Sequence, residues 1–255
     1  MSAHHHCARV NGQCNRCDFP VPFDFTMAFQ PIVDVNQRKV IYYEALVRGP
    51  NGESAYSILN QVTDVLMYRF DQACRIKAIA LASKLGMQEC LSVNFLPNAV
   101  YEPKACIQAT LETAHCVGWP TAKLNFEIVE TERVNDRMHM RRIIESYREM
   151  GLTTSLDDFG NGYANLDLLI DLRPDTLKID RDLIRGCESD KRRQAILCSL
   201  VALAETLGTG LIAEGIETRE ESRYLLSLGI SMQQGYYFSP PNVEALAEID
   251  DAKYD

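Results

Sequence analysis

The sequence predicts an α/β fold in which the strands close into a barrel, and two observations favour it. From residue 88 onward, short β-rich runs alternate with longer segments whose apolar residues recur every three to four positions, as in parallel strands joined by helices. The chain has 255 residues, a length that is typical of one such barrel domain. An open, doubly wound sheet is the alternative that this pattern also permits.

The expected elements follow in chain order. Ranges 25–33 and 39–46 flank the turn-like segment 34–37 and predict an antiparallel hairpin, and 56–85 is a long helical region. Further strands are expected at 91–95, 124–129, 153–156, 176–179, 210–213 and 230–233, with helices at 99–116, 136–150, 165–171, 191–207 and 219–228. With the two hairpin strands, the number of strands reaches the eight of a barrel.

Composition limits the class of function. The chain has 26 basic and 35 acidic residues and a formal net charge of −9, which disfavours a nucleic-acid polymer as partner. A small anionic substrate remains compatible with this charge if carboxylates hold divalent cations that reverse the local sign. No apolar run approaches the roughly 20 residues that span a bilayer, and the first residues lack the order of a signal peptide. We therefore expect a cytoplasmic protein without membrane insertion.

Polar and mostly acidic residues stand where the expected strands end, which is where the active site of a barrel lies. They are Glu44, Asn94, Glu127, Asp157, Asp158, Lys178, Glu214 and Gln234. One such carboxylate would be an ordinary exposed residue, but five that converge repel one another unless a counter-charge is present. Oxygen ligands without histidine or thiolate select Mg²⁺ or Mn²⁺, and the adjacent Asp157 and Asp158 fit a pair of cations.

Several short motifs contain these residues. They are Glu44-Ala45-Leu46 with Arg48, Asp157-Asp158-Phe159-Gly160, Leu177-Lys178-Ile179-Asp180, Ala213-Glu214-Gly215-Ile216-Glu217 and Gln234-Gly235-Tyr236. In this order they resemble the EAL-domain phosphodiesterases of bacterial second-messenger signalling, over the range from about 25 to 241. The resemblance implies a TIM-like (β/α)8 barrel with an antiparallel first strand. The chain would then consist of a Cys/His-rich tail, 1–24, and an EAL phosphodiesterase domain, 25–255.

The resemblance also implies an activity, the hydrolysis of c-di-GMP to linear pGpG with two divalent cations. One cation would be held by Glu44, Asn94, Glu127 and Asp157, and the other by Asp157, Glu214 and, through water, Asp158. Lys178 would orient or help activate the attacking water, so that Lys178, Glu214 and Glu44 form the catalytic set. The dinucleotide would face Gln30, Arg48 and Gln234. Glu130 would stabilise the loop that follows Asp158.

Alternatives to hydrolysis remain. A catalytically silent effector that only binds c-di-GMP would usually lack a metal ligand, whereas every ligand position is filled here. A different barrel hydrolase, acting on glycerophosphodiesters or sugar phosphates, is disfavoured by the motif set. We also expect a homodimer that forms through the region after Asp158, although the leucines there would equally pack on the barrel.

The first residues are rich in cysteine and histidine. Cys7, Cys14 and Cys17 lie near His4, His5 and His6, and the two-residue gap between Cys14 and Cys17 is compatible with a Zn²⁺ site. The alternative is a tail without fixed structure. The other six cysteines are expected to be reduced thiols.

Overall fold

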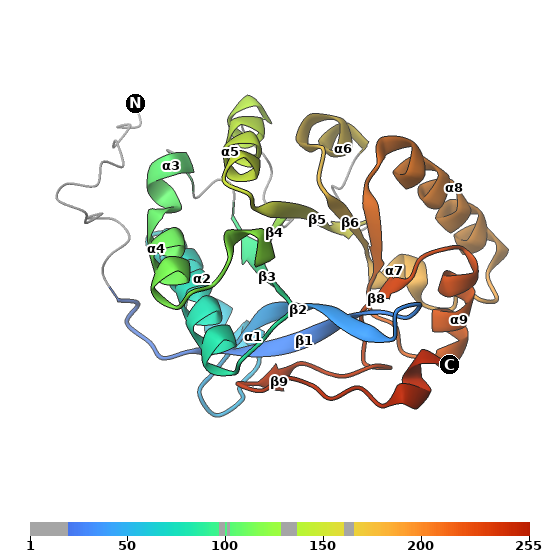
Figure 1. Cartoon of the computed structure of the whole chain (residues 1–255), viewed down its shortest axis with the longest axis horizontal. Coiled ribbons are helices and arrows are strands. Elements are labelled where there is room, and N and C mark those ends of the chain that lie inside the picture. Colours follow the sequence, from blue (N-terminus) through green and yellow to red (C-terminus); the bar gives the residue numbers. More distant parts are fainter. Residues whose placement is uncertain (1–19, 97–99, 101–102, 129–136, 161–165) are drawn as a thin grey trace.

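The computed structural model describes residues 20–96, 100, 103–128, 137–160 and 166–255. Strands β1 to β8 form the predicted closed barrel, and the helices lie outside it (Figure 1). The strands are β1 (Thr26–Asp34), β2 (Lys39–Arg48), β3 (Cys90–Phe95), β4 (Leu124–Ile128), β5 (Thr153–Phe159), β6 (Thr176–Ile179), β7 (Gly210–Ala213), β8 (Met232–Gln233) and β9 (Asn242–Val243).

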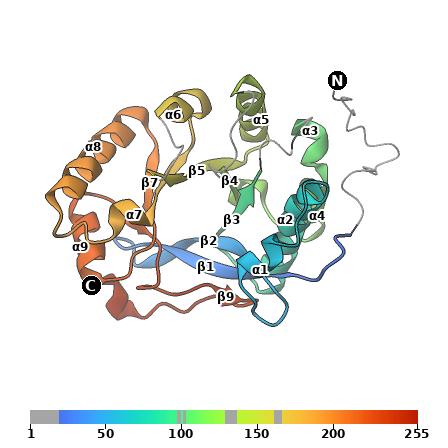
Figure 2. The same ribbon diagram turned by 180° about the vertical axis from the view of Figure 1, so that it is seen from behind.

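Helices connect the parallel strands, and Figure 2 shows the same outer arrangement from behind. They are α1 (Ala55–Leu59), α2 (Met67–Lys84), α3 (Pro103–Cys106), α4 (Gln108–Cys116), α5 (Arg137–Glu149), α6 (Leu166–Leu172), α7 (Arg181–Ile184), α8 (Lys191–Leu207) and α9 (Arg219–Ser227). No helix of the described residues is both long enough and apolar enough to cross a membrane.

Strand β1 closes the barrel and runs against its neighbours, as expected for the first strand. It pairs antiparallel with β2, where Gln30 lies opposite Glu44, and antiparallel with β8, where Val33 lies opposite Gln233. Strands β2 to β8 pair in parallel, so their carboxyl ends meet at one mouth of the barrel. The short strand β9 pairs with the first half of β1.

Packing on the outer face of the barrel determines which side chains point inward. Phe95 on β3, Phe126 on β4 and Tyr147 on α5 form an aromatic cluster whose ring centroids are 5.4 to 5.5 Å apart. Because successive side chains of a strand point to opposite faces, the residues next to these two phenylalanines, Asn94 and Glu127, face the barrel interior.

Two sequence expectations about elements were wrong in detail, and two short elements were missed. Range 56–85 is two helices, α1 and α2, separated by turns that contain the weak helix formers Val62, Thr63 and Val65. Range 99–116 likewise contains two helices, α3 and α4. Helix α7 and strand β9 were missed, because elements of four and two residues are too short to show a period.

Candidate functional site

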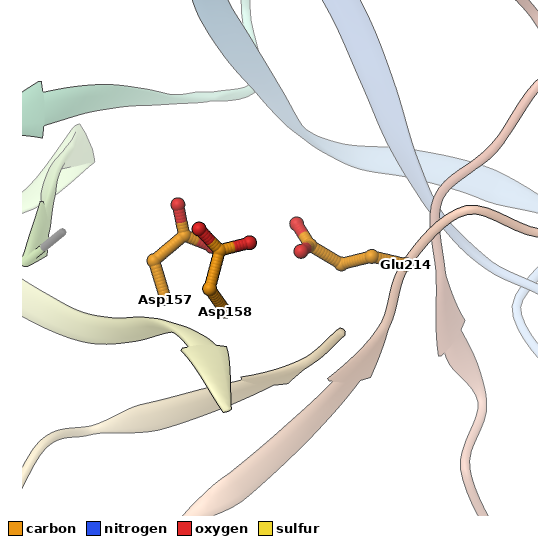
Figure 3. Close-up of side chains that lie close together, drawn as sticks. All are labelled: Asp157, Asp158 and Glu214. Carbon is orange, nitrogen blue, oxygen red and sulfur yellow. The ribbon is translucent and has the colours of Figure 1, made fainter. Parts of the chain in front are cut away.

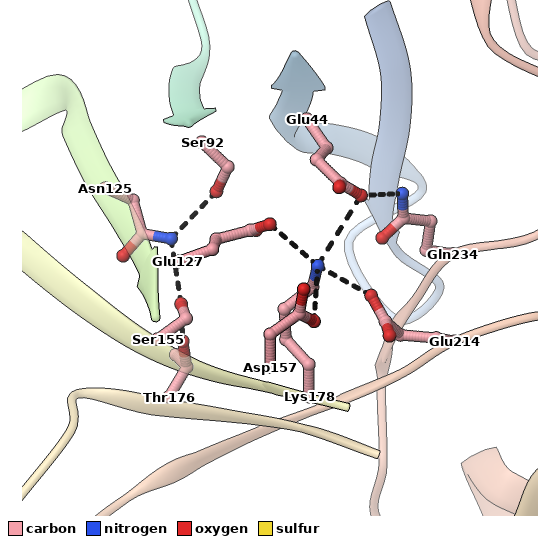
Figure 4. A network of polar contacts seen from close by, with 10 residues as sticks. All are labelled: Glu44, Ser92, Asn125, Glu127, Ser155, Asp157, Thr176, Lys178, Glu214 and Gln234. Atoms are coloured by element: carbon pink, nitrogen blue, oxygen red, sulfur yellow. Dashed lines mark hydrogen bonds and ion pairs between the residues drawn. The ribbon is translucent and has the colours of Figure 1, made fainter. Parts of the chain in front are cut away.

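The carboxyl ends of the strands bring four carboxylates around one amine at the barrel mouth (Figure 4). The amine is Lys178 Nζ on β6. It lies 2.6 Å from Glu214 Oε1, 2.8 Å from Glu127 Oε2, 3.0 Å from Asp157 Oδ1 and 3.5 Å from Glu44 Oε2. Glu44 also accepts a hydrogen bond of 2.7 Å from the Gln234 side-chain amide. Side chains from six strands, or from the residue that directly follows a strand, therefore meet at the barrel mouth.

Lys178 is the electrostatic centre of this group. Its side chain is only 1% exposed. Burial opposes the charge on the amine, but Asp157, Glu127, Glu214 and Glu44 outweigh that effect and raise the pKa of Lys178 well above its ordinary value. Lys178 is therefore a permanent cation at neutral pH.

Three carboxyl groups at this site, those of Glu127, Glu214 and Asp158, have raised pKa values. Burial raises the pKa of Glu127 to about 8, with Glu44 and Asp157 adding to the rise and Lys178 opposing it. Burial also raises the pKa of Glu214 well above its ordinary value, despite Lys178. The pKa of Asp158 rises to about 6 through burial and its neighbour Asp157. One ammonium therefore does not compensate this number of buried carboxylates.

Asp157 and Asp158 both face the mouth although they are neighbours in a strand. Asp158 has φ of +53°, and the pairing of β5 with β6 is irregular between Leu156 and Phe159. A left-handed residue at a bulge turns its side chain away from the ordinary alternation, and aspartate tolerates that conformation. As a result, carboxylate oxygens of Asp157, Asp158 and Glu214 lie within 4.8 Å of one another (Figure 3).

The residues present fit a pair of divalent cations. Glu127 Oε1 and Gln234 Oε1 are buried and have no hydrogen-bond partner among the described residues. Buried oxygens of this kind are costly unless a partner binds them. Five carboxylates against one ammonium leave a formal charge of −4 when all are ionised, which two divalent cations would balance. All the donors are oxygens, which suit hard cations.

The other predicted site residues lie at the same end of the barrel or near it. Asn94 stands beside Glu127 in the pairing of β3 with β4. Gln30 is buried and donates a hydrogen bond of 3.2 Å to the carbonyl of Ser239. Arg48, at the end of β2, is half-buried and donates to the neighbouring carbonyl of Val47 at 2.7 Å.

Two predictions concern residues outside the described ranges. Glu130, expected to stabilise the loop after Asp158, is one of them. Cys7, Cys14 and Cys17, the candidate zinc ligands, are the others. Both remain predictions.

The sequence analysis missed a set of buried polar residues directly beneath the site, which we call the polar layer. Its members are Ser92, Asn125, Ser155 and Thr176, from β3, β4, β5 and β6 (Figure 4). Each stands two positions before a predicted site residue, so strand alternation places both on the same face. That spacing was the available signal, but serine and threonine in a strand are too common to be noticed without the contacts.

Comparisons with known proteins find similarity over most of the chain. The family model for the EAL domain matches residues 23–241. A standalone EAL protein from Vibrio cholerae O395, solved in its c-di-GMP-bound form, is 45% identical with a TM-score of 0.90, and the match covers 92% of this chain and 100% of that one. The manganese and cyclic di-GMP complex of BlrP1 from Klebsiella pneumoniae is 33% identical with a TM-score of 0.83, covering 90% of this chain and 59% of BlrP1.

Curated relatives are longer proteins. PdeG of Escherichia coli K12, named a probable cyclic di-GMP phosphodiesterase, is 29% identical over 234 residues, which cover 87% of this chain and 44% of PdeG. Over several curated relatives, this chain spans between 28% and 55% of the relative's length. The similarity therefore concerns one domain of those proteins.

Proposed function

The chain belongs to the EAL domain family, and on this premise we propose that it hydrolyses c-di-GMP to linear pGpG with two divalent cations, Mg²⁺ or Mn²⁺. The observation that carries the proposal is the excess of buried carboxylate over ammonium at the barrel mouth, together with the Glu127 oxygen that no described residue binds. The c-di-GMP complexes of the Vibrio cholerae protein and of BlrP1 support the choice of substrate.

The donor groups divide into two sets that share Asp157. We assign one cation to Glu44, Asn94, Glu127 and Asp157, and the other to Asp157, Glu214 and, through water, Asp158. When bound, such cations lower the pKa of a water molecule and neutralise charge that develops on phosphoryl oxygens. The oxygens of Asp157, Asp158 and Glu214 that lie within 4.8 Å of one another support the second set.

Lys178 has a narrower role than a general base. Burial lowers the pKa of Lys178, but the surrounding carboxylates outweigh this effect and raise it well above the ordinary value, so in the metal-free chain the amine carries its proton at neutral pH. It can donate a hydrogen bond to the attacking water or to a phosphate oxygen. We therefore propose that Lys178 orients the attacking water and stabilises negative charge. Glu44 and Glu214, which hold the cations beside it, complete the catalytic set.

Substrate contacts are assigned to Gln30, Arg48 and Gln234. The Gln234 amide is held by Glu44, which fixes it at the edge of the carboxylate group. Gln30 lies opposite Glu44 in the β1–β2 pairing, so the side-chain amides of Gln30 and Gln234 lie on the same side of the mouth. Arg48 has a planar guanidinium that can give a phosphate two hydrogen bonds.

The test is to incubate the purified chain with c-di-GMP and to measure pGpG with Mn²⁺, Mg²⁺, Ca²⁺ or EDTA. We expect product with Mn²⁺ or Mg²⁺ and strong suppression with Ca²⁺, which prefers six to eight ligands at longer distances. Full turnover in EDTA, or equal turnover with Ca²⁺, would contradict the role of the cations. Binding of c-di-GMP without any pGpG would instead identify a silent effector.

The expected homodimer stays a prediction, and α6 is the element that supports it. Leu168 and Leu169 pack on the barrel, whereas Leu166 and Ile170 are 57% and 69% exposed. We propose that these two exposed side chains belong to the contact between two copies. A monomer mass by light scattering at micromolar concentration, with turnover unchanged on dilution, would contradict it.

A further inference from the structure

The polar layer lies one step deeper in the barrel than the site. Its residues on β3, β4, β5 and β6 stand two positions before Asn94, Glu127, Asp157 and Lys178. The interior of an α/β barrel is normally filled by bulky branched apolar side chains. Here four adjacent strands instead place hydroxyl or amide groups inside, and all four residues are buried. This departure from an apolar interior needs a physical reason.

Asn125 is the centre of the polar layer. Its side-chain nitrogen donates to Ser92 Oγ and to Ser155 Oγ, both at 2.8 Å, and its oxygen accepts from Thr153 Oγ1 at 3.1 Å. The hydroxyls of Ser155 and Thr176 are also hydrogen-bonded to each other. A continuous chain of side-chain hydrogen bonds therefore crosses from β3 to β6 (Figure 4).

These hydrogen bonds constrain the distance between neighbouring strands. Apolar packing is not directional and would constrain that distance less. A buried amide or hydroxyl without a partner is costly, so the geometry in which every member of the polar layer is hydrogen-bonded is strongly preferred. Directly above, the carboxylates of Glu127 and Asp157 are buried side by side and repel each other whenever both are ionised. The hydrogen bonds of Asn125 beneath them hold β4 and β5 together and so oppose the separation of the two carboxylates.

We propose that Asn125 is a positioning residue for the cation site: by tying β3, β4 and β5 together, it holds Asn94, Glu127 and Asp157 at the spacing that a cation requires. The inference rests on the cation site of the proposed function. Outer residues that orient metal ligands typically change metal affinity by roughly 10–100-fold when they are replaced. We expect Asn125→Leu, which has similar size and no hydrogen-bonding group, to weaken Mn²⁺ binding by about this factor.

Gln233 provides a matched control. It is also a fully buried amide, with donor bonds of 3.0 Å to the carbonyls of Ser222 and Ile230 and an acceptor bond of 2.6 Å from Ser222 Oγ. These contacts join β8 to Ser222 of α9 and to Ile230 between α9 and β8, outside the barrel. Gln233→Leu should therefore lower the melting temperature as Asn125→Leu does, but leave Mn²⁺ affinity at the wild-type value.

The experiment is calorimetric titration of the full metal-free chain and both variants with Mn²⁺, together with their melting temperatures. Ser92→Ala, which removes a single bond of the polar layer, should weaken Mn²⁺ binding in the same direction by less, and it serves if Asn125→Leu does not fold. Turnover of the Asn125 or Ser92 variant should recover at high Mn²⁺. Wild-type affinity in the polar-layer variants, or equal weakening in Gln233→Leu, would overturn the proposal.

A wild-type chain that binds no Mn²⁺ would refute the cation site of the proposed function. Hydrogen exchange would then test whether Asn125 holds the ends of β3, β4 and β5 together. In EDTA, the backbone amides at the carboxyl ends of β3, β4 and β5 should exchange faster in Asn125→Leu than in Gln233→Leu. Equal exchange in the two variants would show that Asn125 does not hold these strand ends.

Discussion

Two buried, positively charged side chains, Lys178 inside the barrel and Arg75 outside it, differ in the number of carboxylates around them. Lys178 has four carboxylates within 3.5 Å. Arg75 on α2 forms an ion pair with one carboxylate, Asp71, and donates to Thr110 Oγ1 at 3.3 Å. Its guanidinium also lies 5.6 and 5.9 Å from the ring centroids of Phe95 and Phe126.

A structural ion pair differs from a ligand site in the balance of its charges and in whether its oxygens are hydrogen-bonded. The second carboxylate oxygen of Asp71 accepts a hydrogen bond from the backbone amide of Leu96 at 3.3 Å, so its charge is matched and its oxygens are bonded. Around Lys178 the negative charge is in excess, and Glu127 retains an oxygen that no described residue binds. A buried ion pair with balanced charge stabilises the fold. A buried cluster with excess negative charge indicates a site that binds cations.

The largest effect is expected at the unbalanced cluster. Lys178→Ala should lower turnover of c-di-GMP by at least about three orders of magnitude, since residues that act as one catalytic unit are each indispensable. The measurement is pGpG formation at saturating Mn²⁺. Lys77→Ala is the matched control, because that lysine binds the Phe25 carbonyl outside the barrel. Wild-type turnover in Lys178→Ala would remove this residue from the mechanism.

Glu44→Ala and Asp157→Ala are expected to abolish turnover in the same assay.

The balanced pair should respond in stability and not in chemistry. Arg75→Met leaves Asp71 buried without its cation, which typically costs about 3–5 kcal/mol of unfolding free energy. For a chain of this size that corresponds to a melting temperature lower by roughly 6–20 °C. Turnover per folded molecule and Mn²⁺ affinity should stay near wild type.

The double variant Asp71→Leu/Arg75→Met tests whether the uncompensated charge of Asp71 causes the loss of stability. It replaces both charges with apolar groups, so it should recover much of the lost stability. If Arg75→Met weakened Mn²⁺ binding as much as Asn125→Leu, the separation between a structural pair and a ligand site would fail.

A third effect is a pH dependence of the metal-free protein. The pKa of Glu127 is about 8 and that of Asp158 about 6 in the folded chain, above the ordinary values of about 4. The folded state therefore binds more protons than the unfolded state, and its stability should fall as pH rises from about 4 to 8.

Melting temperatures across this pH range, in EDTA and with Mn²⁺, measure that dependence. Mn²⁺ should remove most of the decline, because the ionised carboxylates then have cations to bind. Glu127→Gln should make the decline in EDTA shallower. A melting temperature that rises with pH in EDTA would contradict the assignment of these buried carboxyl groups.

The sequence predicted the site better than it predicted the contacts within it. Glu44, Glu127, Asp157 and Glu214 could be expected to converge because each stands at or near the end of an expected strand, and barrel topology brings such ends together. The central place of Lys178 was not visible, because it depends on side-chain distances across the barrel. Asp71 and Arg75 are four residues apart in a helix, a spacing that usually belongs to a solvated pair, so their burial was not visible either.

The pairing of β1 has a consequence for how the chain folds during synthesis. One edge of β1 pairs with β2 within a local hairpin, which can form as soon as residue 48 is available. Its other edge pairs with β8 and β9, where Val33 meets Gln233 and Ala28 meets Val243, some 200 residues later. Contacts of such long sequence separation form slowly, and an unpaired edge strand invites pairing with other chains. Until the last strands emerge from the ribosome, the nascent barrel is therefore open along β1 and most prone to aggregate at that edge.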